Sequence, residues 1–338
     1  KPPDKALAQA PSTTDEFLIG SWRSFYDESI LSYEEQLKDC AESGINWQNN
    51  PLTVASNEKI SYDANFTWEE MERMYAKYNT YYSASAKGER MTTEVANALV
   101  EEMTTNDRSH CISYYVKDEP SAAAFTGVAE LYLDILKKDP SRFPFVNLFP
   151  NYAGATNLGG SYKDYVSNWV KTVGQDNLEY LAYDHYPFTA FEKVRSSYFS
   201  DLETIRATAY ENGKLKTVAC SQMGYWNGMV CPTPDMARWN VNSFLAYGIK
   251  AITHFCWVAP AYVSPADGGE GMMDFVVNTD GTKTALYEPM RKVNWQTRQL
   301  GSLLMQMDVA HAYHAGTVAQ GAEALPKNFL LQPSNSSD

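Results

Sequence analysis

The stretch Tyr114-Tyr-Val-Lys-Asp-Glu-Pro120 is the part of the sequence that best indicates the fold. It closes an apolar run with two adjacent carboxylates, Asp118 and Glu119, and the proline after them commonly opens a helix. A short apolar strand followed directly by a helix is typical of a parallel β-sheet with helical crossovers. Neighbouring strand residues point to opposite sides, so only one of the two carboxylates can face a cleft directly.

The same alternation of strand and helix recurs along the whole chain. Eight short runs of β-branched or aromatic residues are separated by amphipathic segments with helical spacing. The predicted strands are residues 16–22, 44–48, 77–82, 110–120, 144–152, 178–188, 216–226 and 251–260. This pattern predicts parallel strands joined by helices.

The fold class that follows is α/β, a (β/α)8 TIM barrel with a short C-terminal extension. We expect a linker at 1–15, a catalytic barrel at 16–305, and an extension or the start of a further β-domain at 306–338. The rival is a doubly wound open sheet, which usually carries a Gly-rich phosphate turn after its first strand. Here that turn reads Ser21-Trp-Arg-Ser-Phe-Tyr26, which favours the barrel.

Composition narrows the function classes. The chain has 338 residues, 44% apolar and 20% charged, so a large core is available and global disorder is excluded. The net charge is −13 and no Lys/Arg run is present, which argues against a nucleic-acid partner. An anionic substrate is mildly disfavoured, although a local basic cleft could override the global charge. The sequence contains no apolar stretch of ~20 residues, so it predicts no membrane span.

Cysteine and histidine usage predicts no cofactor. Five cysteines are present without a C-x-x-C pair, and no cluster has metal-ligand spacing, so we expect no metal. Cys220 and Cys231 flank a loop and could pair or stay free. The Pro/Ala/Thr-rich start suggests an exported protein. Oligomeric state is left open.

Active sites of such barrels lie at the C-terminal ends of the strands, so polar and aromatic residues there are candidates. In strand order they are Trp22, Arg23 and Asp27; Asn46 and Gln48; Asp118 and Glu119; Asn147, Asn151 and Tyr152; Asp184, His185 and Tyr186; Ser221, Gln222 and Tyr225; His254 and Trp257. Asp118 and Glu119 could instead cap a helix, and the two histidines are also typical of a barrel core.

Three of these strand ends resemble sequence motifs of a known enzyme clan. A strand-four Glu followed by Pro resembles the acid/base motif of clan A glycoside hydrolases, commonly Asn-Glu-Pro, with Asp118 where Asn is usual. The stretch Asp184-His-Tyr-Pro187 is similar to one in family-42-like β-galactosidases, and Trp257 matches a frequent sugar-stacking Trp. The resemblance covers roughly residues 16–304. It implies a glycoside hydrolase acting on an oligo- or polysaccharide, with Glu119 as general acid/base.

The departure from the clan is at strand seven, where Gln222 stands in place of a nucleophilic Glu. An amide cannot form the glycosyl ester of a retaining double displacement. The residue could be an engineered Glu→Gln replacement, or the enzyme could be inverting, with Asp184 or Asp118 activating water. Alternatively, Asp118-Glu119 resembles the Asp-Glu pair of family 20 and 123 β-N-acetylhexosaminidases, in which Asp orients a 2-acetamido group that attacks the anomeric carbon. The fourth possibility is a barrel that binds sugar without cleaving it.

The predicted site combines these residues. The catalytic candidates are Glu119, Asp118 and Asp184, and the predicted substrate contacts are Gln222, Trp257, His185, Tyr186, Asn147, Tyr152, Tyr225 and Trp22. Among the tyrosines, Tyr152, Tyr186 or Tyr225 could hydrogen-bond an acetamide oxygen.

Overall fold

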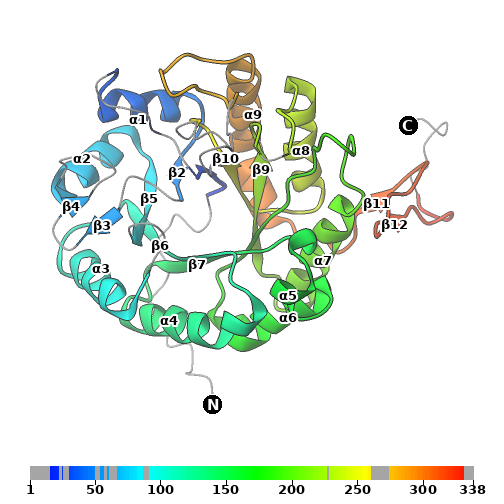
Figure 1. The fold of residues 1–338 in the computed structure, drawn as a ribbon, viewed down its shortest axis with the longest axis horizontal. Coiled ribbons are helices and arrows are strands. Elements are labelled where there is room, and N and C mark those ends of the chain that lie inside the picture. Colours follow the sequence, from blue (N-terminus) through cyan, green and yellow to red (C-terminus); the bar gives the residue numbers. More distant parts are fainter. Residues whose placement is uncertain are drawn as a thin grey trace.

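The computed structural model describes residues 16–22, 25, 30–49, 54–56, 59–60, 67–86, 91–226, 228–259 and 274–330. Within them, eight parallel strands close into a barrel surrounded by helices (Figure 1). The strands are β1 (Leu18–Ser21), β2 (Trp47–Gln48), β5 (Tyr81–Ala86), β6 (Cys111–Asp118), β7 (Phe143–Leu148), β8 (Tyr180–Asp184), β9 (Lys216–Gln222) and β10 (Ala251–Phe255). Each pairs with the next, and β1 pairs with β10 to close the ring. The predicted (β/α)8 TIM barrel is confirmed.

Helices cover the outside of the barrel. They are α1 (Tyr33–Glu42), α2 (Trp68–Tyr78), α3 (Thr93–Thr105), α4 (Phe125–Lys138), α5 (Ala155–Leu158), α6 (Tyr162–Val173), α7 (Tyr198–Glu211), α8 (Pro234–Ala246) and α9 (Tyr287–Gln306). Capping boxes start two of them, Ser32 with Glu35 at α1 and Thr67 with Glu70 at α2. These reciprocal bonds satisfy backbone N–H groups that a helix start leaves without partners.

The predicted third strand was placed too early. Residues 77–82 were expected to form it, but Lys77 and Tyr78 are the last residues of α2, and β5 begins at Tyr81. Asn79 ends the helix in a left-handed conformation (φ 49°), which asparagine tolerates better than most residues. Of the aromatic residues that indicated a strand, Tyr78 therefore belongs to the helix, and only Tyr81 and Tyr82 lie in β5.

The core has two layers because strand side chains alternate between the barrel interior and the helices. Inside the barrel lie Leu18, Trp47, Ile112, Tyr115, Phe143, Phe145, Tyr180, Ala182, Val218 and Ala251. A larger cluster, including Tyr114, Leu148, Leu181 and Trp169, fills the space between strands and helices. The interior is thus packed, and a ligand can bind only at an end of the barrel.

Smaller elements lie outside the barrel. A hairpin of β3 (Val54–Ser56) and β4 (Lys59–Ile60) joins the sheet at β5, and β11 (Tyr313–His314) pairs with β12 (Glu323–Ala324) in the C-terminal extension. Tyr247 and His314 share a 2.8 Å hydrogen bond that links the extension to the end of α8. The predicted linker at 1–15 lies outside the described residues.

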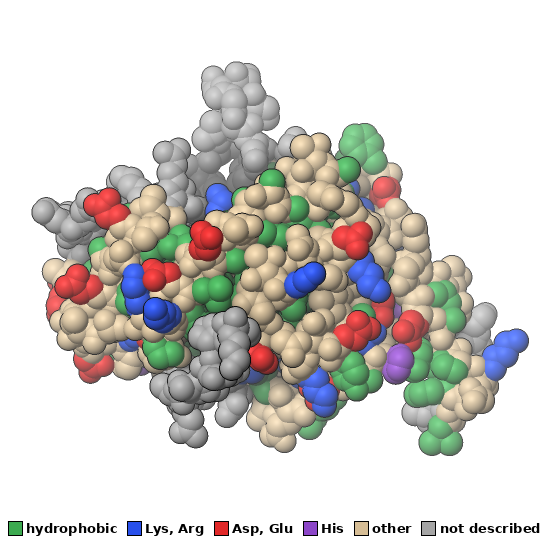
Figure 2. All heavy atoms as spheres, turned by 90° about the horizontal axis from the view of Figure 1, so that it is seen from below, with side chains coloured by type: hydrophobic (Ala, Val, Ile, Leu, Met, Phe, Trp, Pro, Cys, Tyr) green, Lys and Arg blue, Asp and Glu red, His purple; other side chains and the backbone are tan. Residues whose placement is uncertain are grey.

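The cysteines, the helices and the charged surface can each be compared with what the composition predicted. All five cysteines are free thiols, so Cys220 and Cys231 do not pair. Among the described residues, we find no helix with the length and hydrophobicity of a membrane span. Acidic and basic side chains are intermixed over the face seen in Figure 2.

Candidate active site

A β-bulge reshapes the end of β6. Tyr115 pairs with Phe145 of β7, but Lys117 pairs with the next residue, Val146, so β6 contains one extra residue. Such a one-residue slip changes which side chains face the barrel axis. Asp118 consequently pairs with Asn147, whose Nδ2 donates a 3.1 Å hydrogen bond to Asp118 Oδ1. Lys117 is exposed.

Glu119 follows the bulge in an unusual backbone conformation. Its φ is +41°, a left-handed value that few residues other than glycine adopt. The backbone N–H of Glu119 donates to the Asn147 carbonyl at 2.8 Å, and Tyr165 donates from its hydroxyl to the Pro120 carbonyl at 2.6 Å. Left-handed residues of this kind cost about 1–3 kcal/mol and tend to occur at functional sites. The neighbouring strand and helix α6 therefore hold Glu119 in place.

Asp184 ends β8 and is only 5% exposed. Burial raises the pKa of this carboxyl well above its usual value, and the negative charges of Glu119 and Asp118 raise it further. Hydrogen bonds with Tyr186 and Asn147 oppose this shift. Within the described residues, Asp184 Oδ1 accepts no hydrogen bond. Because nearby negative charges disfavour a further one, Asp184 holds its proton more tightly than an isolated carboxyl does.

Asn147 lies between two of these carboxyls. Besides its bond to Asp118, its side chain hydrogen-bonds Asp184. Burial raises the pKa of Asp118, while hydrogen bonds from Asn147 and Tyr115 partly oppose the rise. The structure therefore brings Asp118, Glu119, Asp184 and Asn147 together at the C-terminal mouth of the barrel, and we call these four residues the carboxylate cluster.

Aromatic rings from four strand ends form a wall beside the carboxylate cluster. Trp22 meets Tyr115 edge-on at 5.0 Å between ring centroids, and Phe255 lies 6.3 Å from Trp22. Trp226 contacts Phe255 at 5.0 Å and Tyr186 at 4.7 Å. The predicted substrate contacts include Trp22 and Tyr186; Trp226 was expected either to line a subsite or to fill the barrel wall, and Phe255 was not predicted. The position of Phe255 at the end of β10 was the available signal.

Two predicted contacts lie away from the mouth. The Trp257 ring is 1% exposed and packs against His254 and Tyr287 of α9. His185 is equally buried, and its Nδ1 lies 2.7 Å from Asp201 Oδ2 on α7. Burial lowers the pKa of His185. Both rings pack against the outer helices; His185 does so because it directly follows Asp184, which faces inward.

Tyr152 connects the ends of β7 and β8. Its hydroxyl accepts a 3.1 Å hydrogen bond from the Tyr186 backbone, and its ring meets His185 edge-on at 5.0 Å. The guanidinium of Arg195 lies 3.9 Å from the centre of the Tyr152 ring. Tyr225 is 38% exposed beyond β9.

Gln222, at the end of β9, is fully buried and its amide is fully used. Its Nε2 donates to the carbonyls of Phe188 (2.9 Å) and Val230 (2.8 Å), and its Oε1 accepts from the Phe188 N–H at 2.8 Å. The side chain thus joins the loops that follow β8 and β9. This pattern requires two donors on one side chain, which an amide has and a carboxylate lacks.

Other strand-end candidates brace the barrel. Asn46 Oδ1 accepts from the Ile19 N–H at 2.7 Å, and Ser221 Oγ lies 2.7 Å from His254 Nδ1. Gln48 is 1% exposed, and the Asn151 N–H donates to Asp201 at 3.0 Å. Arg23 and Asp27 lie outside the described residues.

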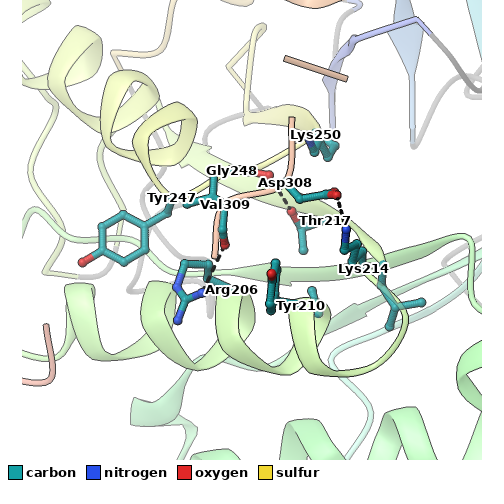
Figure 3. Close-up of a pocket in the computed structure, with 11 residues that line it drawn as sticks. Arg206, Tyr210, Lys214, Thr217, Tyr247, Gly248, Lys250, Asp308 and Val309 are labelled. Atoms are coloured by element: carbon teal, nitrogen blue, oxygen red, sulfur yellow. Dashed lines mark hydrogen bonds and ion pairs between the residues drawn. The ribbon is translucent and has the colours of Figure 1, made fainter. Parts of the chain in front are cut away.

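The opposite end of the barrel carries a shallow hollow of about 300 Å³ whose charged groups are already paired (Figure 3). Lys214 pairs with Asp308 at 2.8 Å, Arg206 donates to the Val309 carbonyl at 3.1 Å, and Lys250 donates to the carbonyls of Leu304 and Met307. Among the described residues, no group of three or more His, Cys, Asp or Glu side chains could hold a metal ion. The carboxylate cluster is therefore the better candidate site.

Comparison with known proteins gives the fold. No protein-family model and no curated protein matches the sequence. Among solved structures, xylanase 10B from Thermotoga maritima is 11% identical, with a TM-score of 0.53 over 85% of this chain and 97% of that one. The β-galactosidase from the psychrophilic Marinomonas ef1 is 11% identical, with a TM-score of 0.59 over 88% of this chain and 63% of that one.

A third similar structure is the Ruminococcus gnavus β-glucuronidase, 10% identical with a TM-score of 0.54 over 83% of this chain. The match spans 50% of that protein. The glucuronidase and the galactosidase thus extend well beyond the part that this chain resembles. At these identities the likeness shows a shared barrel fold.

Proposed function

We propose that this chain is a glycoside hydrolase in which Glu119 is the general acid/base. The observation that carries the proposal is the carboxylate cluster at the C-terminal mouth of the barrel, where such barrels place their catalytic groups. Carboxyls whose pKa values are raised beside other acids can supply both a proton donor for the leaving oxygen and a negative charge near the anomeric carbon. The xylanase, galactosidase and glucuronidase on the same fold support this class.

The second catalytic group is the main question, because β9 supplies no carboxylate. We propose substrate assistance, in which Asp118 orients a 2-acetamido group and Glu119 protonates the glycosidic oxygen. The acetamide oxygen then attacks the anomeric carbon as the C–O bond breaks, and Glu119 afterwards takes a proton from the incoming water. Support comes from the bulge, which turns Asp118 toward the barrel axis beside Asn147. Asp184 as the base of an inverting enzyme is the alternative within the same class.

The bonding of Gln222 supports its being native. A glutamate in this place would face the carbonyl oxygens of Phe188 and Val230 with no hydrogen to donate to either. We therefore infer that Gln222 holds the two loops, and that an engineered Glu→Gln replacement does not explain the missing nucleophile.

The test is turnover of aryl glycosides by the native protein and Glu119→Gln. The panel compares 4-nitrophenyl N-acetylhexosaminides with plain hexosides and pentosides. Glu119→Gln should lower kcat by about 100- to 10,000-fold, the usual contribution of a general acid, with little change in melting temperature. Glu130→Gln, an exposed residue of α4, is the matched control and should change neither.

The outcomes separate the mechanisms. Cleavage restricted to 2-acetamido sugars, with a further loss in Asp118→Asn, supports substrate assistance. Cleavage of sugars without that group points to Asp184, and a folded Glu119→Gln protein with full activity rejects the proposal.

A second function is a barrel that binds sugar without hydrolysing it. The observation favouring it is that Gln222, at the position of the clan nucleophile, is wholly engaged in bracing loops. It predicts measurable sugar affinity without product even at high protein concentration. Any product that disappears in Glu119→Gln would exclude it.

A further inference from the structure

Arg195 is a partly buried cation near the carboxylate cluster. Its guanidinium has few good hydrogen-bond partners among the described residues. The residue lies in the loop between β8 and α7, where its backbone N–H donates to the Pro187 carbonyl at 2.7 Å. Its Nε reaches the Tyr186 carbonyl only at 3.5 Å, and another guanidinium nitrogen lies 3.8 Å from Met229 Sδ. A guanidinium offers more N–H groups than these two long contacts use.

Other arginines in the described part of the chain show what is usual here. The other partly or fully buried ones all form ion pairs with Asp or Glu: Arg108, Arg142, Arg206, Arg291 and Arg298. Arg195 forms no ion pair with any described carboxylate. Removing a cation from water without an anion is unfavourable, so a site that keeps one leaves it available for a ligand.

The Tyr152 ring places Arg195 relative to the carboxylates. Burial raises the pKa of Tyr152, the negative charges of Asp184 and Glu119 raise it further, and the positive charge of Arg195 lowers it. Such effects act over short distances, so Tyr152 is near both the cation and the acids. The guanidinium carbon lies over the Tyr152 ring, 3.9 Å from its centre, which is within the range of a cation–π interaction.

Resting on the proposed function, we propose that Arg195 binds an anionic group of the substrate, a carboxylate or a sulfate, on a sugar held beside Tyr152. The planar guanidinium matches the paired oxygens of such groups, whereas a neutral sugar hydroxyl needs no cation. A local positive charge can recruit an anion although the whole chain carries −13. The substrate class is therefore an acidic glycan.

The experiment uses matched pairs of substrates that differ only in the anion. The carboxylate pair is 4-nitrophenyl β-glucuronide and β-glucoside, and the sulfate pair is 4-nitrophenyl N-acetyl-β-glucosaminide with and without a 6-sulfate. Native protein is compared with Arg195→Gln, Arg195→Lys and the control Arg73→Gln, an exposed arginine of α2. We expect Arg195→Gln to lower kcat/KM for the preferred anionic member by about 10- to 100-fold, the usual effect of losing a charged hydrogen bond.

For the neutral member, the change should be less than about 3-fold, because no charged bond is lost. Arg195→Lys should keep part of the preference, since it retains charge without the planar fork. A preference for the neutral members, or an anionic preference that survives in Arg195→Gln, overturns the inference and leaves Arg195 as a brace for Tyr152.

Binding separates this inference from the proposed hydrolysis. Calorimetric titration of the native protein with glucuronate against glucose, and with N-acetylglucosamine 6-sulfate against N-acetylglucosamine, needs no turnover. Tighter binding of an anionic sugar that is lost in Arg195→Gln supports the anion site even if no glycoside is cleaved, and only the hydrolase proposal then fails. Equal binding within both pairs overturns the anion site even if neutral glycosides are cleaved.

Discussion

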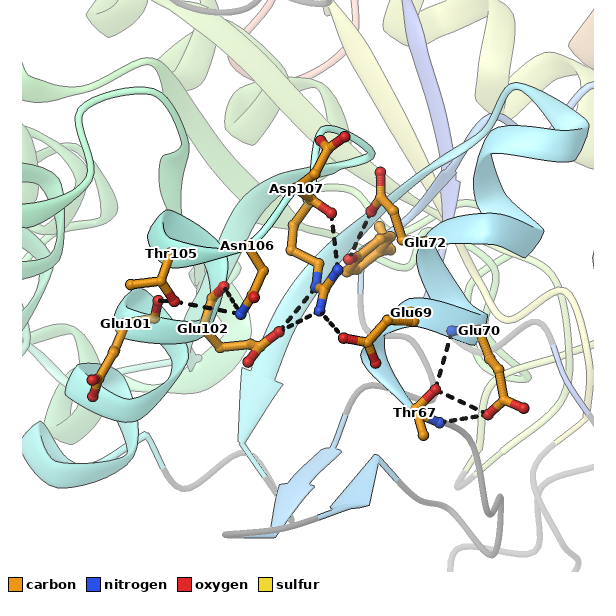
Figure 4. Close-up of polar contacts among 11 residues, drawn as sticks. Thr67, Glu69, Glu70, Glu72, Glu101, Glu102, Thr105, Asn106 and Asp107 are labelled. Atoms are coloured by element: carbon orange, nitrogen blue, oxygen red, sulfur yellow. Dashed lines mark hydrogen bonds and ion pairs between the residues drawn. The ribbon is translucent and has the colours of Figure 1, made fainter.

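The two ends of the barrel treat buried charge in opposite ways. At the end where the strands begin, Asp139 Oδ2 accepts from Arg142 at 2.7 Å and from the Tyr114 hydroxyl at 2.6 Å. Nearby, Arg108 donates to Glu102 at 2.7 Å and to Glu69 at 2.9 Å (Figure 4). At the mouth, where the strands end, Asp184 faces two other acids.

The two ends of the barrel shift the pKa of a buried carboxyl in opposite directions. Burial alone would raise the pKa of Asp139, but hydrogen bonds from Ser141, Tyr114 and Arg142 hold it below its usual value. Burial raises the pKa of Asp184, and its acidic neighbours add to the rise. Asp139 is 2% exposed and Asp184 is 5% exposed, so the partners make the difference.

The comparison indicates that the end where the strands begin stabilises the fold, whereas unfavourable electrostatic interactions are concentrated at the mouth. Compensated charges at the strand starts add stability, whereas crowded acids, a left-handed Glu119 and an Arg195 without an ion pair to any described carboxylate reduce it. Proteins commonly retain such local costs where chemistry needs them. Three substitutions test the contrast.

The largest effect should come from Asp139→Ala at the base. It leaves Arg142 without its carboxylate and the Tyr114 hydroxyl without an acceptor, so unfolding free energy should fall by about 3–5 kcal/mol. Denaturant titration measures the loss, and kcat of the folded protein should not change. The control is Asp134→Ala, which removes an exposed partner of Lys138 and should alter stability by less than about 0.5 kcal/mol. A similar loss of unfolding free energy in both variants would contradict the proposal that the charges at this end of the barrel stabilise the fold.

Gln222→Glu should have the next largest effect. The carboxylate loses both donated bonds and faces two carbonyl oxygens, so stability should fall by about 2–3 kcal/mol without any gain in turnover. Thermal unfolding and the aryl glycoside panel measure the two quantities. A large gain in activity instead would identify residue 222 as the nucleophile position and contradict our interpretation of Gln222 as a brace.

Asp184→Asn should stabilise the protein slightly, by about 1–2 kcal/mol at neutral pH, while lowering activity. Because the pKa of Asp184 is raised in the folded state, the native protein binds this proton more tightly than the unfolded chain does. Native stability therefore falls as pH rises from the unfolded value of about 3.9 toward the folded pKa, and Asn removes that loss.

The stability difference between Asp184→Asn and the native protein should accordingly grow with rising pH. Unfolding free energies at several pH values from 4 to 8 measure it, with the exposed Asp235→Asn as control. A difference that stays constant or shrinks over this range would show that Asp184 is not held in a raised-pKa state.

Much of the fold and the centre of the site followed from local sequence patterns. Eight strand runs, the Glu119-Pro120 step and the position of Asp184 all depend on neighbouring residues, and the structure places them as a barrel predicts. The third strand was misplaced because Lys77 and Tyr78, which precede the aromatic pair Tyr81 and Tyr82, fit the end of a helix as well as the start of a strand. Trp257 was expected at the mouth, but its side chain points toward α9.

Local patterns in the chain are enough to establish the strand and helix periodicity, the lack of a carboxylate at position 222, and the pair of acids after the fourth barrel strand. Three features become visible only once the barrel is closed: a bulge turns Asp118 toward Asn147, Gln222 joins two loops, and Arg195 lies on Tyr152 without an acid partner among the described residues. The reason is the separation along the chain over which each kind of interaction acts. Periodicity and turn chemistry act between residues a few positions apart, whereas hydrogen-bond partners and pKa values depend on groups brought together when the barrel closes.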